Sequence, residues 1–379
     1  EVAMFTLLLT GLNAFIGFNV VNAVTRKYFE KSIDILTFSK FNGNCFLIFL
    51  ISVILILLCV FSFNSLISSY LLIPKDWVII AVITSVFTFV LNFRLVIWQI
   101  TDKVLPYLST QIFQSLINAM LSISLVITFS LGADGRVYGI GISFIILGLI
   151  SFIHLLKSKL LIFNFNKNDI KYALLICLPL LPHSISGFVL GSVDRFVINS
   201  NLGASSTGIY MVAVSLGSAL NIIFLSINKA YCPWLFTTLN TANYQKKTLI
   251  VKKTYIYFMT LIFLSIISFY LSPYILILIV DEKFYAAAEV LPVIILGQFF
   301  LGMYLMVTNY IFYVKKTGYL AIITILSGLL NLVLLLILIP RFGVIGAAYS
   351  FSISNFFQFL GVWITSAKVY YMPWSLRKI

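Results

Sequence analysis

The polar residues between Pro179 and Arg195 are the strongest candidates for chemistry in this chain. The stretch reads PLLPHSISGFVLGSVDR, with His183 near its start and Asp194 beside Arg195 at its end. Ionisable side chains are costly in hydrocarbon and normally face a polar interior or one another. Pro179 and Pro182 bend a helix and free backbone groups. We therefore expect this otherwise apolar segment to line a water-accessible cavity.

Each ionisable residue of this stretch has two interpretations. Asp194 and Arg195 form either a structural ion pair or a direct contact with a substrate. His183 is either a core histidine or a ligand or proton carrier, and it lies nearly on the same helical face as Asp194. Because the segment ends near Ile198, the Asp194-Arg195 pair lies about one turn from its outer end, which suits an outer gate or a structural tie. His183 and Gly187 lie nearer the centre.

The composition places these residues in a membrane protein. Hydrophobic residues make up 61% of the 379 residues, charged residues only 9%, and the mean hydropathy is +1.09. Apolar runs of about 20 residues can cross a bilayer as helices. We expect an all-α, polytopic protein with eleven spans in this sequence: 2–24, 43–63, 77–99, 106–131, 137–156, 172–198, 206–235, 249–271, 287–313, 317–339 and 344–368.

The net charge of +14 follows from topology. Alternate loops hold 18 of the lysines and arginines, the other loops hold four, and three lie within spans: Arg94, Arg195 and Lys229. Such a bias marks the cytoplasmic side. We therefore expect Glu1 outside and Ile379 in the cytoplasm, in a bacterial cytoplasmic (inner) membrane, and no nucleic-acid partner.

Polar residues at helical spacing recur in at least six spans. In the first span Asn19, Asn22 and Arg26 would share one face, and the fourth span carries the clearest stripe. Each stripe is explained either by hydrogen bonds between neighbouring helices or by a central cavity, and their number favours a cavity. Arg94 either faces that cavity or extends to the headgroups. The candidate substrate or cavity residues are Arg26, Arg94, Gln111, Gln114, Asn118, His183, Asp194, Arg195, Asn221, Lys229 and Gln298.

Catalytic and metal-binding patterns are absent from the sequence. The four cysteines lack close spacing and read as small apolar residues. The expected outer loops, 64–76, 132–136, 199–205, 272–286 and 340–343, are short and hold no carboxylate pair with a histidine. We expect no enzyme activity, cofactor or metal, although an integral-membrane polysaccharide polymerase or ligase is a remaining alternative.

A basic stretch from Lys157 to Lys171 divides the spans into two groups. We expect an N-terminal bundle at 1–160 and a C-terminal bundle at 161–379. The chain begins with Glu rather than Met, so we expect one more span before it, with a signal peptide as the alternative. The complete fold would then be two six-helix bundles around a central cavity.

Residues 174–236 resemble a known family. The Leu-Pro-Leu-Leu-Pro-His run, Asp194-Arg195-Phe196, Gly208-Ile209-Tyr210 and Pro233 resemble polysaccharide-repeat-unit (O-antigen or capsule, Wzx-type) flippases of the multidrug/oligosaccharidyl-lipid/polysaccharide exporter superfamily. The early segment FNVVNAVTRKYFE resembles that family's second span. The resemblance covers essentially the whole chain and is weak outside 174–236.

The resemblance implies a twelve-span transporter for lipopolysaccharide or a related polysaccharide. It would move undecaprenyl-pyrophosphate-linked oligosaccharide from the cytoplasmic to the outer leaflet by alternating access. Its implied partners are this lipid-linked oligosaccharide, membrane lipids, and the polysaccharide polymerase and chain-length proteins of the same pathway.

Two transporters of the same superfamily remain open as alternatives. A cation-coupled multidrug exporter would need an intramembrane carboxylate in the first bundle, but Glu30, Asp34, Asp76, Asp102 and Asp134 all fall at span ends or in loops. A peptidoglycan-precursor flippase is the closer alternative, and the context of the Asp194-Arg195 pair favours the repeat-unit group.

Overall fold

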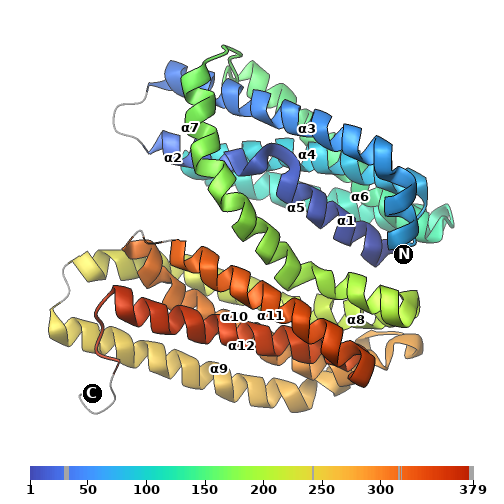
Figure 1. The fold of residues 1–379 in the computed structure, drawn as a ribbon, viewed down its shortest axis with the longest axis vertical. Coiled ribbons are helices and arrows are strands. Elements are labelled where there is room, and N and C mark those ends of the chain that lie inside the picture. The colour runs from blue at the N-terminus through green and yellow to red at the C-terminus, as the bar shows by residue number, and fades with distance from the viewer. Residues whose placement is uncertain (30–33, 241–242, 315, 317, 375–379) are drawn as a thin grey trace. The chain divides into compact units, whose positions relative to one another are not determined.

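The computed structural model shows a protein built of α-helices (Figure 1). It describes residues 1–29, 34–240, 243–314, 316 and 318–374, without the side chains of Leu180, His183 and Ser186, and these residues contain no β-strand. The helices are α1 (Val2–Phe15), α2 (Val20–Tyr28), α3 (Ile35–Leu71), α4 (Lys75–Ile100), α5 (Val104–Ile123), α6 (Gly132–Lys157), α7 (Lys167–Cys177), α8 (Leu181–Asn240), α9 (Tyr244–Ile279), α10 (Ala287–Tyr313), α11 (Gly318–Phe342) and α12 (Val344–Val369). Short 3₁₀ or π turns lie at Ile16–Asn19, Ser124–Thr128, Leu178–Leu180 and Glu282–Phe284.

Side-chain caps begin several of these helices. Asp34 accepts a hydrogen bond from the Thr37 backbone N–H at the start of α3, and Asn243 accepts one from Lys246 N–H at the start of α9. Such caps satisfy backbone donors that the first helical turn leaves unpaired. The hydrogen bond to Thr37 lowers the pKa of the Asp34 carboxyl.

Nine stretches of the described residues are long and apolar enough to cross a membrane, so the protein is a multi-pass membrane protein. One of them, Gly187–Asn240, combines parts of two predicted spans, which form the two helical segments of α8 on either side of a kink at Gly203. The predicted last span coincides with α12, which is not among the nine. Buried polar side chains such as Ser350, Asn355 and Gln358 lower its mean hydropathy.

The chain forms two compact units, Glu1–Phe188 and Val189–Ile379. The boundary falls later than the predicted division at 160, because α7 packs against α2 and α3 within the first unit (Figure 1). The core of the first unit is rich in phenylalanine, and the rings of Phe49 and Phe89 stack with centroids 4.2 Å apart. In the second unit α10 is the most buried helix, covered by α9 and α12.

Two of the predicted outer loops are displaced by a few residues, and a third is a sharp break within α8. Residues 132–136 begin α6, so the turn before it lies at 129–131, and 340–342 complete α11, so the next turn lies at Gly343. The predicted break at 199–205 is confirmed, because two helical segments of α8 meet at a kink at Gly203, with φ 82° and ψ 176°. Glycine alone adopts that conformation at little cost. The predicted interruption at Pro179 is confirmed, because a 3₁₀ turn at Leu178–Leu180 separates α7 from α8.

The first predicted span also breaks, between α1 and α2. Gly17, Phe18 and Asn19 all have positive φ, at 74°, 46° and 59°. Asn19 therefore precedes α2 instead of sharing a continuous helical face with Arg26, and the predicted stripe is wrong at this point. Ser52 Oγ accepts a hydrogen bond from Gly17 N–H at 2.8 Å, and Asn19 Nδ2 donates to Ser184 Oγ at 2.8 Å.

Candidate functional site

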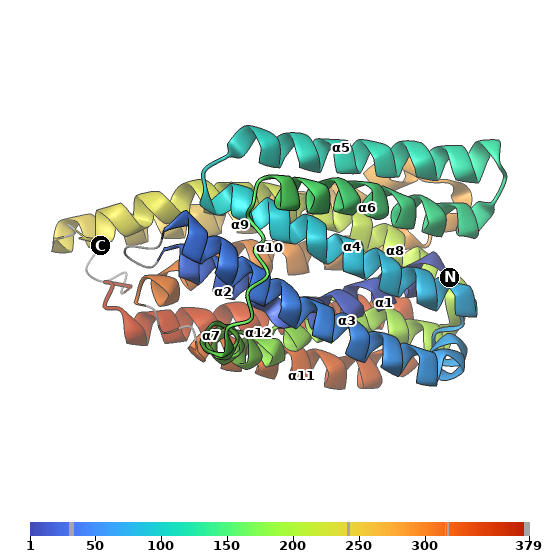
Figure 2. The same cartoon turned by 90° about the horizontal axis from the view of Figure 1, so that it is seen from above.

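The α5 helix presents the clearest polar surface of the first unit. Figure 2 shows α5 at the edge of this unit, alongside α6. Ser122 is its only buried residue, whereas Gln111 is exposed and Gln114 and Asn118 are half-buried. Gln111 Nε2 donates to the Tyr107 hydroxyl at 3.1 Å, which leaves its carbonyl oxygen available. The predicted stripe is thus an accessible row of amides.

Arg136 completes this surface and is not among the residues predicted from the sequence. Its Nη1 donates to Asn118 Oδ1 at 2.9 Å and to Ser122 Oγ at 2.6 Å. The sequence pattern places Arg136 in an outer loop, but it is the fifth residue of α6. The signal that could have found it is the pair of glycines on either side, Gly135 and Gly139, because small residues permit close helix contacts.

The glycines hold Arg136 against α5. A Cβ atom at Gly139 would lie 2.5 Å from Ser122 Oγ, and one at Gly135 would lie 2.8 Å from the Leu125 carbonyl carbon. Larger residues at either position would separate α6 from α5. The close approach of α6 to α5 therefore places the Arg136 guanidinium beside the row of amides. This arrangement suits a ligand that carries an anionic group next to hydroxyl groups.

Arg94 is buried inside the first unit. Its side chain is 2% exposed, and its guanidinium carbon lies 4.3 Å from the centroid of the Trp98 ring. The Trp98 ring in turn lies 5.6 Å from that of His154. Packing encloses the Arg94 side chain, and both interpretations, a cavity-facing residue and one that extends to the headgroups, stay predictions. Arg94 Nε and Nη1 have no hydrogen-bond partner, so its position is compatible with a cation held for an anionic or aqueous partner.

Asp194 acts as a tie between the two halves of α8. The Tyr210 hydroxyl donates a hydrogen bond to its Oδ2, and the Arg195 backbone N–H donates to its Oδ1 at 2.8 Å. Asp194 and Tyr210 are 3% and 0% exposed. Both motifs, Asp194-Arg195 and Gly208-Ile209-Tyr210, stand out in the sequence, but their contact across the Gly203 bend does not.

The other predicted cations and His183 do not gather at one described site. Lys229 on α8 and Arg26 at the end of α2 are exposed. Arg195 is half-buried, and its Nε has no hydrogen-bond partner. The side chain of His183 lies outside the described residues. The roles of all four in transport stay predictions.

Two asparagines on helices of the second unit, Asn309 and Asn331, connect neighbouring helices. Asn309 Nδ2 on α10 donates to Asn228 Oδ1 on α8 at 2.7 Å. Asn331 on α11 donates to the carbonyl oxygens of Val189 and Leu190 at 3.4 Å. These residues fit the interhelical interpretation.

Two predicted cavity residues of the second unit, Gln298 and Asn221, have an unpaired side-chain oxygen, as Asn331 does. Gln298 is 5% exposed, and neither its Oε1 nor Asn221 Oδ1 has a hydrogen-bond partner. An unpaired acceptor in the interior is costly. Both side chains therefore keep unused hydrogen-bonding capacity, as a ligand-facing residue would.

The concentrated polar groups among the described side chains suit the binding of a polar ligand. These groups are amides, hydroxyls and guanidinium groups, and no cluster of three or more His, Cys, Asp or Glu occurs among the described residues. Such groups can neutralise phosphate and bond to sugar hydroxyls.

A family comparison matches more than half of the chain. The family model described as polysaccharide biosynthesis protein matches residues 1–239. The chain belongs to this family. The matched residues include the whole first unit and all of α8 but its last residue, so they contain both the α5 surface and the Asp194–Tyr210 tie.

Two proteins of Haemophilus influenzae are similar in sequence to this family member. The Lsg locus putative protein 1 is 22% identical over 307 residues, which cover 76% of this chain and 75% of that protein. An uncharacterized membrane protein is 24% identical over 255 residues, covering 66% and 63% of the two chains.

Solved transporter structures share its fold. The inward-facing conformation of a multidrug resistance MATE family transporter of the MOP superfamily has a TM-score of 0.74 at 15% identity, covering 97% of this chain and 89% of the other. Lipid II flippase MurJ, in an inward closed conformation, has a TM-score of 0.74 at 16% identity, with coverage of 96% and 80%. At such low identity these similarities establish the all-helical, two-bundle transporter fold.

Proposed function

We propose that this protein is a flippase for undecaprenyl-pyrophosphate-linked oligosaccharide repeat units of an O-antigen or capsule. It moves them from the cytoplasmic to the outer leaflet of the bacterial inner membrane without chemical change. The observation that carries this proposal is the accessible α5 surface, where Arg136 is held beside a row of amides. Membership of the polysaccharide biosynthesis family supports it.

The chemistry of this surface suits a pyrophosphate joined to sugars. A guanidinium can neutralise phosphate oxygens by charge-assisted hydrogen bonds. Amide groups such as those of Gln111 and Gln114 both donate to and accept from sugar hydroxyls. A polar path is required because charged groups are very costly in hydrocarbon. The polyprenyl chain can stay in the lipid phase throughout.

Alternating access is the mechanism that we propose for this movement. In many transporters two bundles rock about a central site and expose it to each side in turn. The two compact units and the resemblance of the fold to transporter structures support this mechanism. The proposed partners are the lipid-linked oligosaccharide itself and the polymerase and chain-length proteins that act on it after transport.

The Arg136→Gln variant tests the proposal in cells that depend on this protein. Losing a charge-assisted contact should reduce surface polysaccharide about tenfold or more, and lipid-linked units should accumulate inside. Arg136→Lys should restore part of the transport because it keeps the charge. Arg341→Gln is the matched control, since Arg341 is exposed at the end of α11 and should leave export unchanged.

The comparison requires equal amounts of each variant in the membrane. Normal export by a stable Arg136→Gln variant would contradict the role of this surface. Deletion of the gene separates the substrate classes. Accumulation of a lipid-linked repeat unit supports the proposal, whereas increased drug sensitivity or loss of peptidoglycan precursor at the outer face would identify one of the two alternative transporters.

A further inference from the structure

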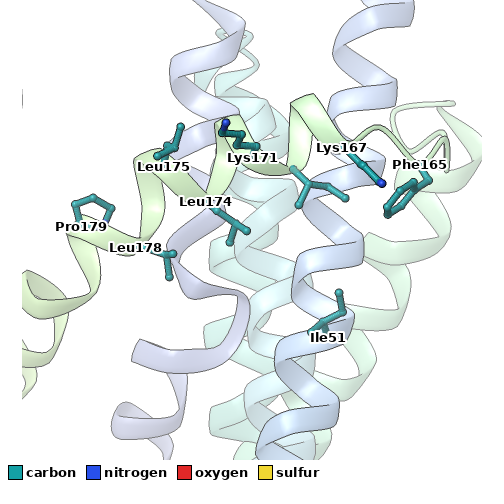
Figure 3. A pocket seen from close by; sticks show the side chains of 9 residues that line it. Ile51, Phe165, Lys167, Lys171, Leu174, Leu175, Leu178 and Pro179 are labelled. Carbon is teal, nitrogen blue, oxygen red and sulfur yellow. The ribbon is translucent and has the colours of Figure 1, made fainter.

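A groove on the first unit combines an apolar floor with two lysines. Its volume is about 530 Å³, and it lies between α3 and α7 (Figure 3). Leu174, Leu175, Leu178 and Pro179 of α7 and the turn after it line the groove together with Ile51 of α3. The lining residues Lys167 and Lys171 come from the first turns of α7, and Phe165 precedes them.

Both lysines lie at the polar end of the groove, with their amino groups pointing apart (Figure 3). They are four residues apart and so lie on one face of α7, and both are exposed. Asp169 lies two residues from each of them, on the opposite side of the helix, and its Oδ2 accepts a hydrogen bond from Asn44 Nδ2 at 3.3 Å. The N-terminus of a helix carries partial positive charge, so the two lysines there are in an unfavourable position. An anion bound at this end would neutralise the lysines and interact favourably with the helix dipole.

The apolar floor suits one hydrocarbon chain. Leu175 and Ile51 remain 66% and 55% exposed, so a chain lying there would cover apolar surface. From Lys167 to Pro179 the helical path is about 18 Å long at 1.5 Å per residue. One leaflet contributes about 15 Å of hydrocarbon, half of the usual core. The groove therefore matches the acyl chain of one leaflet and is too short for a long polyprenyl chain.

We propose that this groove binds an anionic glycerophospholipid of the cytoplasmic leaflet. The headgroup phosphate lies between Lys167 and Lys171, and one acyl chain lies along Leu174, Leu178 and Pro179 against Ile51. The lysine bias of the sequence puts this end of α7 on the cytoplasmic side, where basic pockets between membrane helices meet anionic headgroups. The bound lipid would bridge α3 and α7. This site is separate from the α5 surface and does not depend on the proposed transport function.

Photo-crosslinking in nanodiscs tests this site. The probe is phosphatidylglycerol with a diazirine on one acyl chain, present as a minor component in phosphatidylcholine. We expect labelled peptides from α3 around Ile51 and from α7 between Leu174 and Pro179. Lys167→Gln/Lys171→Gln should reduce this labelling about thirtyfold, from the attraction of two lysines to an anionic lipid. Lys157→Gln/Lys159→Gln has the same net charge and should reduce it no more than about twofold.

A second variant tests the apolar part. Leu178→Trp should fill the groove and abolish labelling while both lysines remain, and thermal unfolding of each purified variant identifies those that still fold. Equal labelling of the lysine variant and its control would overturn the proposal. Equal labelling by a phosphatidylcholine probe would also overturn it, because the groove would then hold only bulk lipid. Stronger labelling by a diazirine polyprenyl phosphate would overturn it in favour of the carrier lipid.

Discussion

Helices α5 and α11 hold corresponding places in the two units but use their asparagines differently. Each packs against the last long helix of its unit, α6 or α12, and each carries a single asparagine, near the middle of α11 and toward the end of α5. Asn331 on α11 is 1% exposed and donates to backbone carbonyls of α8. Asn118 on α5 is half-buried and accepts a hydrogen bond from Arg136.

The difference shows that a polar stripe alone does not identify a cavity. Among the 18 most apolar consecutive residues of each span, 33% are buried in α11 but only 6% in Val104–Thr128, which comprises α5 and the π turn after it. The same residue type therefore joins helices in one unit and holds an arginine on an accessible surface in the other. We infer that interhelical amides such as Asn331 contribute to stability, and we propose that the polar groups of α5 contribute to substrate binding.

The largest expected effect is the loss of the tie inside α8. Tyr210→Phe leaves the buried Asp194 carboxylate without its hydroxyl donor, which should cost about 3 kcal/mol of stability. Unfolding of the purified protein in detergent measures this loss. Tyr274→Phe is the matched control, because Tyr274 is 69% exposed. Equal stability of the two variants would show that the Tyr210–Asp194 hydrogen bond does not stabilise the second unit.

Substitution at Gly203, in the bend that brings Tyr210 to Asp194, should have the next largest effect on stability. Gly203→Ala places a side chain at φ 82°, which should destabilise the protein by about 2 kcal/mol. Gly191→Ala is the control within the same helix, since a Cβ atom there meets no atom within 4 Å. That control should be neutral or stabilising by up to about 1 kcal/mol. If both substitutions are neutral in the same unfolding assay, the bend does not constrain the tie.

The direct test of the comparison uses one substitution at two positions. Asn331→Ala removes interhelical hydrogen bonds and buried volume and should cost about 1.5 kcal/mol. Asn118→Ala should cost less than about 1 kcal/mol but reduce polysaccharide export, because Arg136 loses a partner. Unfolding and export are measured on both. The reverse pattern, with export failing only for Asn331→Ala, would contradict the division of roles.

The smallest expected effect is at the exposed end of the α5 row. Gln111→Leu should change stability by less than about 0.5 kcal/mol. Export should fall about fivefold, as expected when a single neutral hydrogen bond of about 1 kcal/mol is lost. Ser109→Ala serves as the control on the same helix. Unchanged export by Gln111→Leu would exclude Gln111 from the proposed binding surface and leave only the residues next to Arg136.

The sequence predicted the architecture better than the contacts. Hydropathy and lysine bias are averages over many residues, so single errors do not change the predicted class. The contact between Arg136 and α5 depends instead on where α6 begins. The glycine-rich start of α6 resembles a loop in the sequence, so this contact was not predicted. The burial of Arg94 depends on which neighbours enclose it, and no periodicity within α4 contains that information. The Asp194–Tyr210 contact required the backbone angle at Gly203, which the sequence suggests only weakly.

The corner between α1 and α2 has a consequence for the order in which the protein assembles. Its polar groups are satisfied by Ser52 of α3, by Ser184 of α8 and by the Cys177 thiol, which donates to the Asn19 carbonyl oxygen at 3.3 Å. Unpaired backbone groups are costly within a membrane. During synthesis the contacts of Asn19 with Cys177 and Ser184 can form only after residues 177–184 have been inserted. The corner is therefore completed late in the folding of the first unit. A chain that stops after α6 would retain an open, hydrated corner and should be a target for membrane proteases.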